Sequence, residues 1–168
     1  MKSVEIKSAF LQGRPIQRDV FVKPPREIYE EKLWKLKKCL YGLNDAAREW
    51  YLKVEETVKE VGGQKSKLDQ AVFLWKDENN KLLGYCTTHV DDFIVGGDDS
   101  FRENFINSLK TNFTVSHECD GVLKYVGLLI EQTDKSITIS QPDYIRDLNY
   151  EPQPKETLHT PLKEEQRD

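Results

Sequence analysis

The sequence contains few cysteines, one methionine and no long apolar run. Its three cysteines, Cys39, Cys86 and Cys119, are odd in number and widely spaced, which excludes a disulfide framework and a paired-cysteine zinc motif. No apolar stretch approaches the roughly 20 residues that a membrane-spanning helix needs. The first residues also lack the apolar core of a signal peptide. We therefore expect a soluble intracellular protein with reduced cysteines and no membrane partner.

The composition is that of one folded domain with a modest negative charge. Of the 168 residues, 38% are hydrophobic and three are tryptophan, which favours a single compact globule over a disordered chain. Residues 1–70 hold 15 basic and 11 acidic residues, whereas residues 71–168 hold 10 basic and 18 acidic ones. This asymmetry fits a basic track beside an acidic pocket, and it fits an ordinary mixed surface equally well.

Hydrophobic periodicity predicts an α+β fold with a mainly antiparallel sheet and packed helices. The expected elements are strands near residues 4–6, 19–25 and 33–38, a helix over 44–61, a hairpin of 71–75 and 82–88, a second hairpin through 89–95, a helix from 100 to about 112, a third hairpin of 122–131 and 136–139, and a short helix over 142–148. We expect residues 1–150 to form the folded domain. Residues 151–168 have the composition of a charged, proline-containing linker.

The helix over 44–61 has the clearest signals, because Asn44 or Asp45 can cap it and the glycines at 62 and 63 end it. The residues expected on its buried face are Ala47, Trp50, Tyr51, Val54, Val58 and Val61. The residues expected on its solvent-exposed face are Arg48, Glu49, Lys53, Glu56 and Lys59. For the next helix, Ser100 and Glu103 have the spacing of a capping box.

Two adjacent acids, Asp91 and Asp92, follow Val90 between two apolar β segments. Taken alone, such a pair at a hairpin tip is more often a turn former than a catalytic site. Because neighbouring strand residues point to opposite faces, only one of the two is expected on an acidic face. A second acid from another strand, for which Glu5 is the candidate, would then be needed to hold a hard divalent cation.

Four motifs and a short run near the C-terminus, all in order, resemble those of copia-type retrotransposon reverse transcriptases, over residues 3–162. Residues 4–13, VEIKSAFLQG, are similar to the first catalytic motif of that family. Residues 36–51 resemble its LYGL segment, and residues 88–92, THVDD, resemble its YVDD box. Residues 124–130, KYVGLLI, resemble the hairpin that grips the primer end, and residues 160–162 match the run toward the ribonuclease H connection.

The resemblance implies a polymerase palm that copies RNA into DNA with two Mg²⁺ ions. It assigns Glu5 and Asp91 as catalytic metal ligands supported by Asp92, and Phe10 as the residue under the sugar that excludes a 2′-hydroxyl. Tyr41 and Gly42 would form the floor of the nucleotide pocket. The residues implied to contact nucleic acid are Lys37, Lys38, Arg48, Lys124, Tyr125 and Gly127. The implied partners are an RNA template, a DNA primer, a dNTP, and the fingers and ribonuclease H segments of a parent polyprotein. The implied location is the cytosol, a virus-like particle or the nucleus.

Three departures from the family pattern predict weak or absent activity of this chain alone. Glu5 stands where the family has aspartate, and His89 where it has tyrosine. The chain also starts at the first catalytic motif, so we expect the fingers to be incomplete. An alternative interpretation is a non-catalytic module, derived from a retrotransposon, that binds nucleic acid or protein. A third interpretation, a nucleotide cyclase, rests on Gly96–Asp99, which resemble a diguanylate cyclase signature but leave residues 3–51 unexplained.

Overall fold

A computed structural model describes residues 1–28 and 32–148, and its centre is an antiparallel sheet of six strands. In spatial order, the strands are β4 (Gln64–Lys65), β5 (Val72–Lys76), β6 (Leu82–His89), β7 (Asp92–Gly97), β1 (Lys2–Ile6) and β8 (Val115–Asp120). The first strand of the chain thus lies between β7 and β8, and it pairs with both in antiparallel register.

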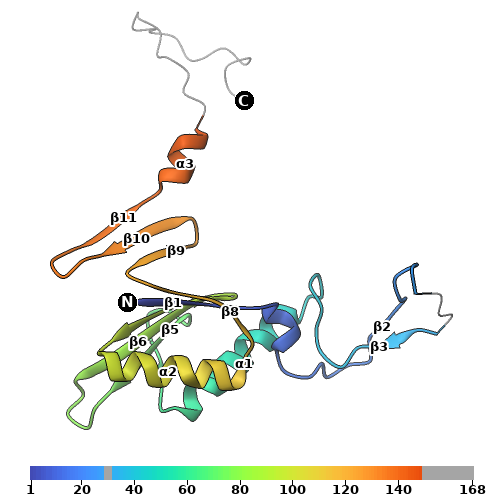
Figure 1. Ribbon diagram of the computed structural model, residues 1–168. Coiled ribbons are helices and arrows are strands. Elements are labelled where there is room, and N and C mark those ends of the chain that lie inside the picture. The colour runs from blue at the N-terminus through green and yellow to red at the C-terminus, as the bar shows by residue number, and fades with distance from the viewer. Residues whose placement is uncertain (29–31, 149–168) are drawn as a thin grey trace, which may run out of the picture.

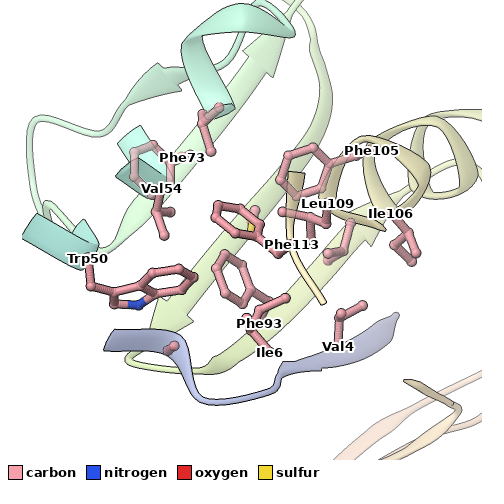
Figure 2. Packing of buried hydrophobic residues seen from close by; sticks show 14 of the residues in the cluster. Val4, Ile6, Trp50, Val54, Phe73, Phe93, Phe105, Ile106, Leu109 and Phe113 are labelled. Carbon is pink, nitrogen blue, oxygen red and sulfur yellow. The ribbon is translucent and has the colours of Figure 1, made fainter. Parts of the chain in front are cut away.

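Two long helices, α1 (Ala46–Glu60) and α2 (Asp99–Asn112), cover one face of this sheet (Figure 1). Alternation along the strands directs Val4 and Ile6 of β1 and Phe93 and Val95 of β7 toward the helices, where all four are buried. Figure 2 shows these strands' side chains meeting Trp50 and Val54 of α1 and the apolar face of α2. This cluster is the main hydrophobic core.

A smaller sheet of three strands lies on the other side of the main sheet. It consists of β9 (Val122–Tyr125), β10 (Leu128–Gln132) and β11 (Ile137–Ser140), and is followed by α3 (Pro142–Asp147). Its Leu123 and Ile130 pack on Ile94 of β7, which points away from the helices. A further pair, β2 (Phe21–Val22) and β3 (Trp34–Lys35), projects from the body of the fold, after the 3-10 helix η1 (Ala9–Gln12) (Figure 1).

The predicted mix of helices with antiparallel sheets is confirmed, as are both helices and the hairpins β5–β6 and β6–β7. Strand β8 was not predicted. The segment predicted as one strand over 122–131 is two strands, because Val126 and Gly127 have φ of 49° and 76° and form a turn. The strands predicted over 19–25 and 33–38 have only two residues each.

Several local predictions about the helices are wrong. Asp98, and not Ser100, caps α2, since its side chain accepts a hydrogen bond from the Phe101 amide at 2.7 Å. Asp45 sits at the start of α1 without capping it, because its carboxylate binds Arg18. Glu49 was expected on the solvent-exposed face, yet only 5% of it is exposed, because Arg14 and Arg48 approach its carboxylate. Ala47 and Val61, expected to be buried, are exposed.

No helix among the described residues is long and apolar enough to cross a membrane. The division into a domain of residues 1–150 and a tail of 151–168 stays a prediction. The tail and the residue 160–162 motif lie outside the described residues.

Candidate active site

The register of β1 against β7 sets Glu5 directly opposite Asp92. Their neighbours Val4 and Phe93 are also opposite each other, and both point toward the helices. Because side chains alternate along a strand, Glu5 and Asp92 share the opposite face of the sheet. Two carboxylates from distant parts of the sequence therefore meet on adjacent strands.

Asp91 belongs to the turn between β6 and β7 and not to a strand. His89 and Asp92 form the last pair of the hairpin, which leaves Val90 and Asp91 as a two-residue connection. The Asp91 carbonyl accepts a hydrogen bond from the Ile6 amide at 2.8 Å, which ties the turn to β1. Strand alternation does not apply to a turn residue, so the expectation that Asp91 and Asp92 face opposite sides is wrong. Both line one groove.

This groove, of about 760 Å³, lies between the acidic face and the β9–β10 hairpin. The three acids line one side, and Lys124, Tyr125 and Gly127 line the other. The Tyr125 hydroxyl lies 3.3 Å from the Thr87 hydroxyl of β6, and the exposed Lys124 ammonium is 2.9 Å from Asp143 of α3. The residues that the sequence assigned to metal and primer binding are thus gathered around a single groove.

The electrostatics of the groove bear chiefly on Asp92. Its burial raises the pKa of the carboxyl above the ordinary value, and the negative charges of Asp91 and Glu5 raise it further. His89 acts in the opposite direction. Three acids that repel one another in a half-buried groove form a region to which a cation would be attracted.

Replacing Asp92 with asparagine should increase the free energy of unfolding at pH 7. The folded-state pKa of Asp92 is raised, so its charged form is disfavoured in the folded protein, and stability is lost as the pH rises through that pKa. The asparagine side chain carries no charge, so the variant does not lose stability in this way as the pH rises. The gain should vanish below about pH 3.9, where the aspartate is protonated in both states. Urea unfolding at both pH values measures the difference.

The exposed Asp134 of the β10–β11 turn provides the matched control. Asp134→Asn makes the same chemical change at a residue that does not line the groove of Glu5 and Asp91, and it should leave the stability nearly unchanged. An Asp92→Asn protein that is less stable than the parent at pH 7 would show that the carboxylate is not under repulsion.

None of the predicted nucleotide-pocket residues, Phe10, Tyr41 and Gly42, lines the acidic groove. Phe10 of η1 packs on the main core and lines a second cavity, of about 130 Å³, together with Trp50, Thr88 and Val90. Its ring centroid is 4.9 Å from that of Tyr41, which is 57% exposed. Gly42 follows with a φ of 88°, a conformation that favours glycine. Phe10 and Tyr41 are therefore in contact.

The remaining predicted nucleic-acid contacts are not at the acidic groove. Lys37 and Lys38 line a separate surface hollow with residues 15–19, next to the β2–β3 pair. Arg48 is exposed near the start of α1, and its guanidinium contacts Glu49 at 2.8 Å. These three cations are available at the surface, but they do not share the groove of Glu5 and Asp92.

The groove residues that sequence reasoning missed include His117 and Cys119 of β8. The His117 Nε2 lies 3.0 Å from the Cys119 sulfur, and His117 is opposite Glu5 in the β1–β8 ladder. The sequence does contain a pattern typical of a strand at β8, because Val115, His117 and Cys119 alternate with more polar residues before Gly121.

Within residues 1–28 and 32–148, no group of three or more His, Cys, Asp and Glu side chains is arranged to bind an ion. The acids at the groove have the right chemistry for a hard cation, but in this conformation they do not form a closed coordination sphere.

The family comparison agrees with the motif order and with the acids at the groove. Residues 1–154 match the family described as reverse transcriptase (RNA-dependent DNA polymerase). The chain belongs to this family.

Among curated proteins, the chain is similar to parts of retrotransposon polyproteins. It is 28% identical over 153 residues to the Retrovirus-related Pol polyprotein from transposon RE1 of Arabidopsis thaliana, a match that covers 88% of the chain and 10% of that protein. It is also 28% identical over 155 residues to the polyprotein from transposon TNT 1-94 of Nicotiana tabacum, covering 86% and 11%. A putative transposon Ty5-1 protein of Saccharomyces cerevisiae is 24% identical, covering 84% of the chain and 47% of that protein. The chain thus spans about a tenth of the plant relatives' length.

Proposed function

We propose that this chain is the nucleotidyl-transfer palm of an RNA-directed DNA polymerase from a copia-type retrotransposon. The observation that carries the proposal is the placement of Glu5 opposite Asp92, with Asp91 in the adjoining turn, along one side of a single groove. Membership of the reverse transcriptase family supports the same reaction. Polymerases of this kind need carboxylates from separate strands to converge, and these carboxylates do.

The donor set fits magnesium in its chemistry. Glu5 and Asp91 would hold the ions, with Asp92 in support, because carboxylate oxygens are the ligands that Mg²⁺ prefers. The raised pKa of Asp92, caused by burial and by its acidic neighbours, indicates a local excess of negative charge that a divalent cation would relieve. When bound, Mg²⁺ supplies charge neutralisation for phosphoryl transfer and activates the attacking hydroxyl.

The other predicted residues would align the substrates. Phe10 would pack under the sugar of the incoming dNTP and exclude a 2′-hydroxyl, while Tyr41, in contact with Phe10, and Gly42 would form the pocket floor. Lys124, Tyr125 and Gly127 lie across the groove from the acids, which suits a role in holding the primer end. Lys37, Lys38 and Arg48 would contact the backbone of the RNA template or DNA primer from outside the groove.

The plant relatives are about ten times longer than the matched segment, so their other parts are candidate partners. We infer that fingers and ribonuclease H segments of a polyprotein act with this palm in an intracellular setting.

Primer extension on poly(rA)/oligo(dT), with Mg²⁺ or Mn²⁺, tests the proposal. We expect metal-dependent extension by the 168-residue chain, at a low rate because Glu5 replaces the aspartate of the family. Asp91→Asn should reduce extension to background, since an amide is a much poorer ligand for Mg²⁺ than a carboxylate. Extension that persists in Asp91→Asn, or is absent from the parent and from its Glu5→Asp variant, would remove the catalytic proposal for this chain.

A non-catalytic nucleic-acid-binding module is the second candidate. Two observations favour it, namely glutamate at position 5 and the lack of a closed metal cluster among the described residues. It predicts binding of an RNA–DNA hybrid without extension, with an affinity that falls steeply as salt rises. An affinity that is flat across salt concentration would contradict recognition of the nucleic-acid backbone.

A further inference from the structure

We propose that Trp50 of α1 is a positioning residue that holds the turn carrying Asp91 through a hydrogen bond to the Val90 carbonyl. The indole Nε1 donates to the Val90 oxygen at 2.6 Å. The catalytic consequence of this contact rests on the proposed function, whereas the positioning itself does not.

The turn needs an external restraint because its sequence does not suit its conformation. Two-residue hairpin connections favour Asn-Gly or Asp-Gly, since one or both positions require positive φ. Here the first position is Val90, a β-branched residue with a φ of 55°. Such a residue rarely adopts this conformation without support from its surroundings. Left to itself, a Val-Asp connection would relax and move the Asp91 carboxylate.

Trp50 is itself held firmly. Only 3% of it is exposed, and its ring packs edge-on against Phe113 with a centroid distance of 5.0 Å. Figure 2 shows the indole reaching from α1 toward the strands that carry Ile6 and Phe93. A single N–H on a rigid ring therefore meets the strained residue of the turn.

The helix that carries Trp50 is also fixed to the segment that follows β1. A side chain at Gly13 would come within 3.0 Å of the Trp50 backbone nitrogen, so the two segments touch. The Arg14 amide donates to the Glu49 carbonyl at 3.2 Å, and the Arg14 guanidinium lies 3.3 Å from Glu56. Hydrogen bonds thus hold the turn at Val90, from Trp50 of α1, and at Asp91, from Ile6 of β1. These two elements are themselves connected through the contacts of residues 13 and 14 with α1.

The test removes only the indole N–H. Trp50 is replaced with its benzothiophene isostere, which keeps the shape but has sulfur in place of the N–H, and separately with phenylalanine. Trp75→Phe is the matched control, because Trp75 is also buried and its Nε1 also donates to a backbone carbonyl, that of Val61, at 2.9 Å away from the turn. Hydrogen exchange is measured at the Ile6 amide, which donates to Asp91, and at the Val95 amide in the interior of β7.

We expect exchange at Ile6 to accelerate about fivefold in both Trp50 variants, as for the loss of one ordinary hydrogen bond. Exchange at Val95 should change much less, and the control should leave Ile6 nearly unchanged. An equal acceleration at Ile6 and Val95 in the isostere variant, or none at Ile6, would overturn the proposal. The isostere decides the matter even if Trp50→Phe fails to fold.

Activity provides a second, separable readout. If the parent extends primers, the isostere variant should lower kcat about tenfold while leaving the KM for primer–template unchanged, because Asp91 moves and the binding surface does not. A raised KM with an unchanged kcat would contradict a positioning role. If neither the parent nor its Glu5→Asp variant extends a primer, the proposed function fails on that ground, and the exchange experiment still decides whether Trp50 holds the turn.

Discussion

Replacing Glu5 with aspartate should increase the rate of primer extension about a hundredfold. The two side chains differ by one methylene, which moves a carboxylate by roughly 1 Å, and a misplacement of that size can cost on the order of a hundredfold in rate. The backbone at position 5 is fixed by pairing with both Asp92 and His117, so the strand cannot shift to compensate for the longer side chain. Single-turnover extension with Mg²⁺ measures the effect on the chemical step.

The same substitution at Glu118 is the control for this prediction. Glu118 lies on β8, next to β1, and contacts Lys2 and Lys110, but it does not line the groove. Glu118→Asp should leave extension nearly unchanged. A Glu5→Asp protein that folds normally and extends no faster than the parent would show that the length of this side chain does not limit the reaction.

Replacing Phe93 with alanine should lower the free energy of unfolding by about 3–5 kcal/mol, the usual cost of removing a buried phenylalanine. Phe93 is fully buried in β7, between β6 and β1, and belongs to the main core. Small domains are stable by only about 5–15 kcal/mol, so a large part of that margin would be lost. Urea unfolding followed by tryptophan fluorescence is suitable, because Trp50 and Trp75 are buried in the same core.

Phe21→Ala tests whether the loss comes from burial. Phe21 is 54% exposed in the β2–β3 pair, and its ring faces the Lys35 ammonium at 6.0 Å. Its replacement should change stability by about 0.5 kcal/mol or less. Similar losses at both positions would contradict the placement of Phe93 at the centre of the core.

The elements with strong local signals could be predicted from the sequence. The residues of β5 and β6 either alternate in polarity or form continuous apolar runs, and an Asp-Glu-Asn-Asn turn joins the two strands. The apolar residues of α1 have helical spacing, and two glycines follow the end of the helix. The motif order also predicted that Glu5 would meet the acid pair, and the β1–β7 register sets Glu5 opposite Asp92. The roles of these residues in catalysis stay predictions.

The features that escaped prediction depend on tertiary contacts or on subtle local patterns. Strand β8 has a histidine and a cysteine where apolar residues would have made the alternation clear, and it is stabilised by pairing with β1. Glu49 has the helical position of a solvent-exposed residue, and it is buried because Arg14, from a distant part of the chain, covers it. The surface hollow of Lys37 and Lys38 lies apart from the acids because of how the β2–β3 pair projects, which no local pattern encodes.

The position of β1 in the main sheet has a consequence for synthesis. The strand at residues 2–6 has both its partners, β7 and β8, in the second half of the chain, so its hydrogen bonds cannot be completed until residue 120 has left the ribosome. Glu5 lacks its partner Asp92 until β7 has emerged, and the other edge of β1 stays unpaired until β8 has emerged. Strand β1, made first, thus completes its pairing only when the last strand of the main sheet is available. Slowing translation over residues 92–120 would prolong the exposure of its unpaired edges to chaperones and proteases.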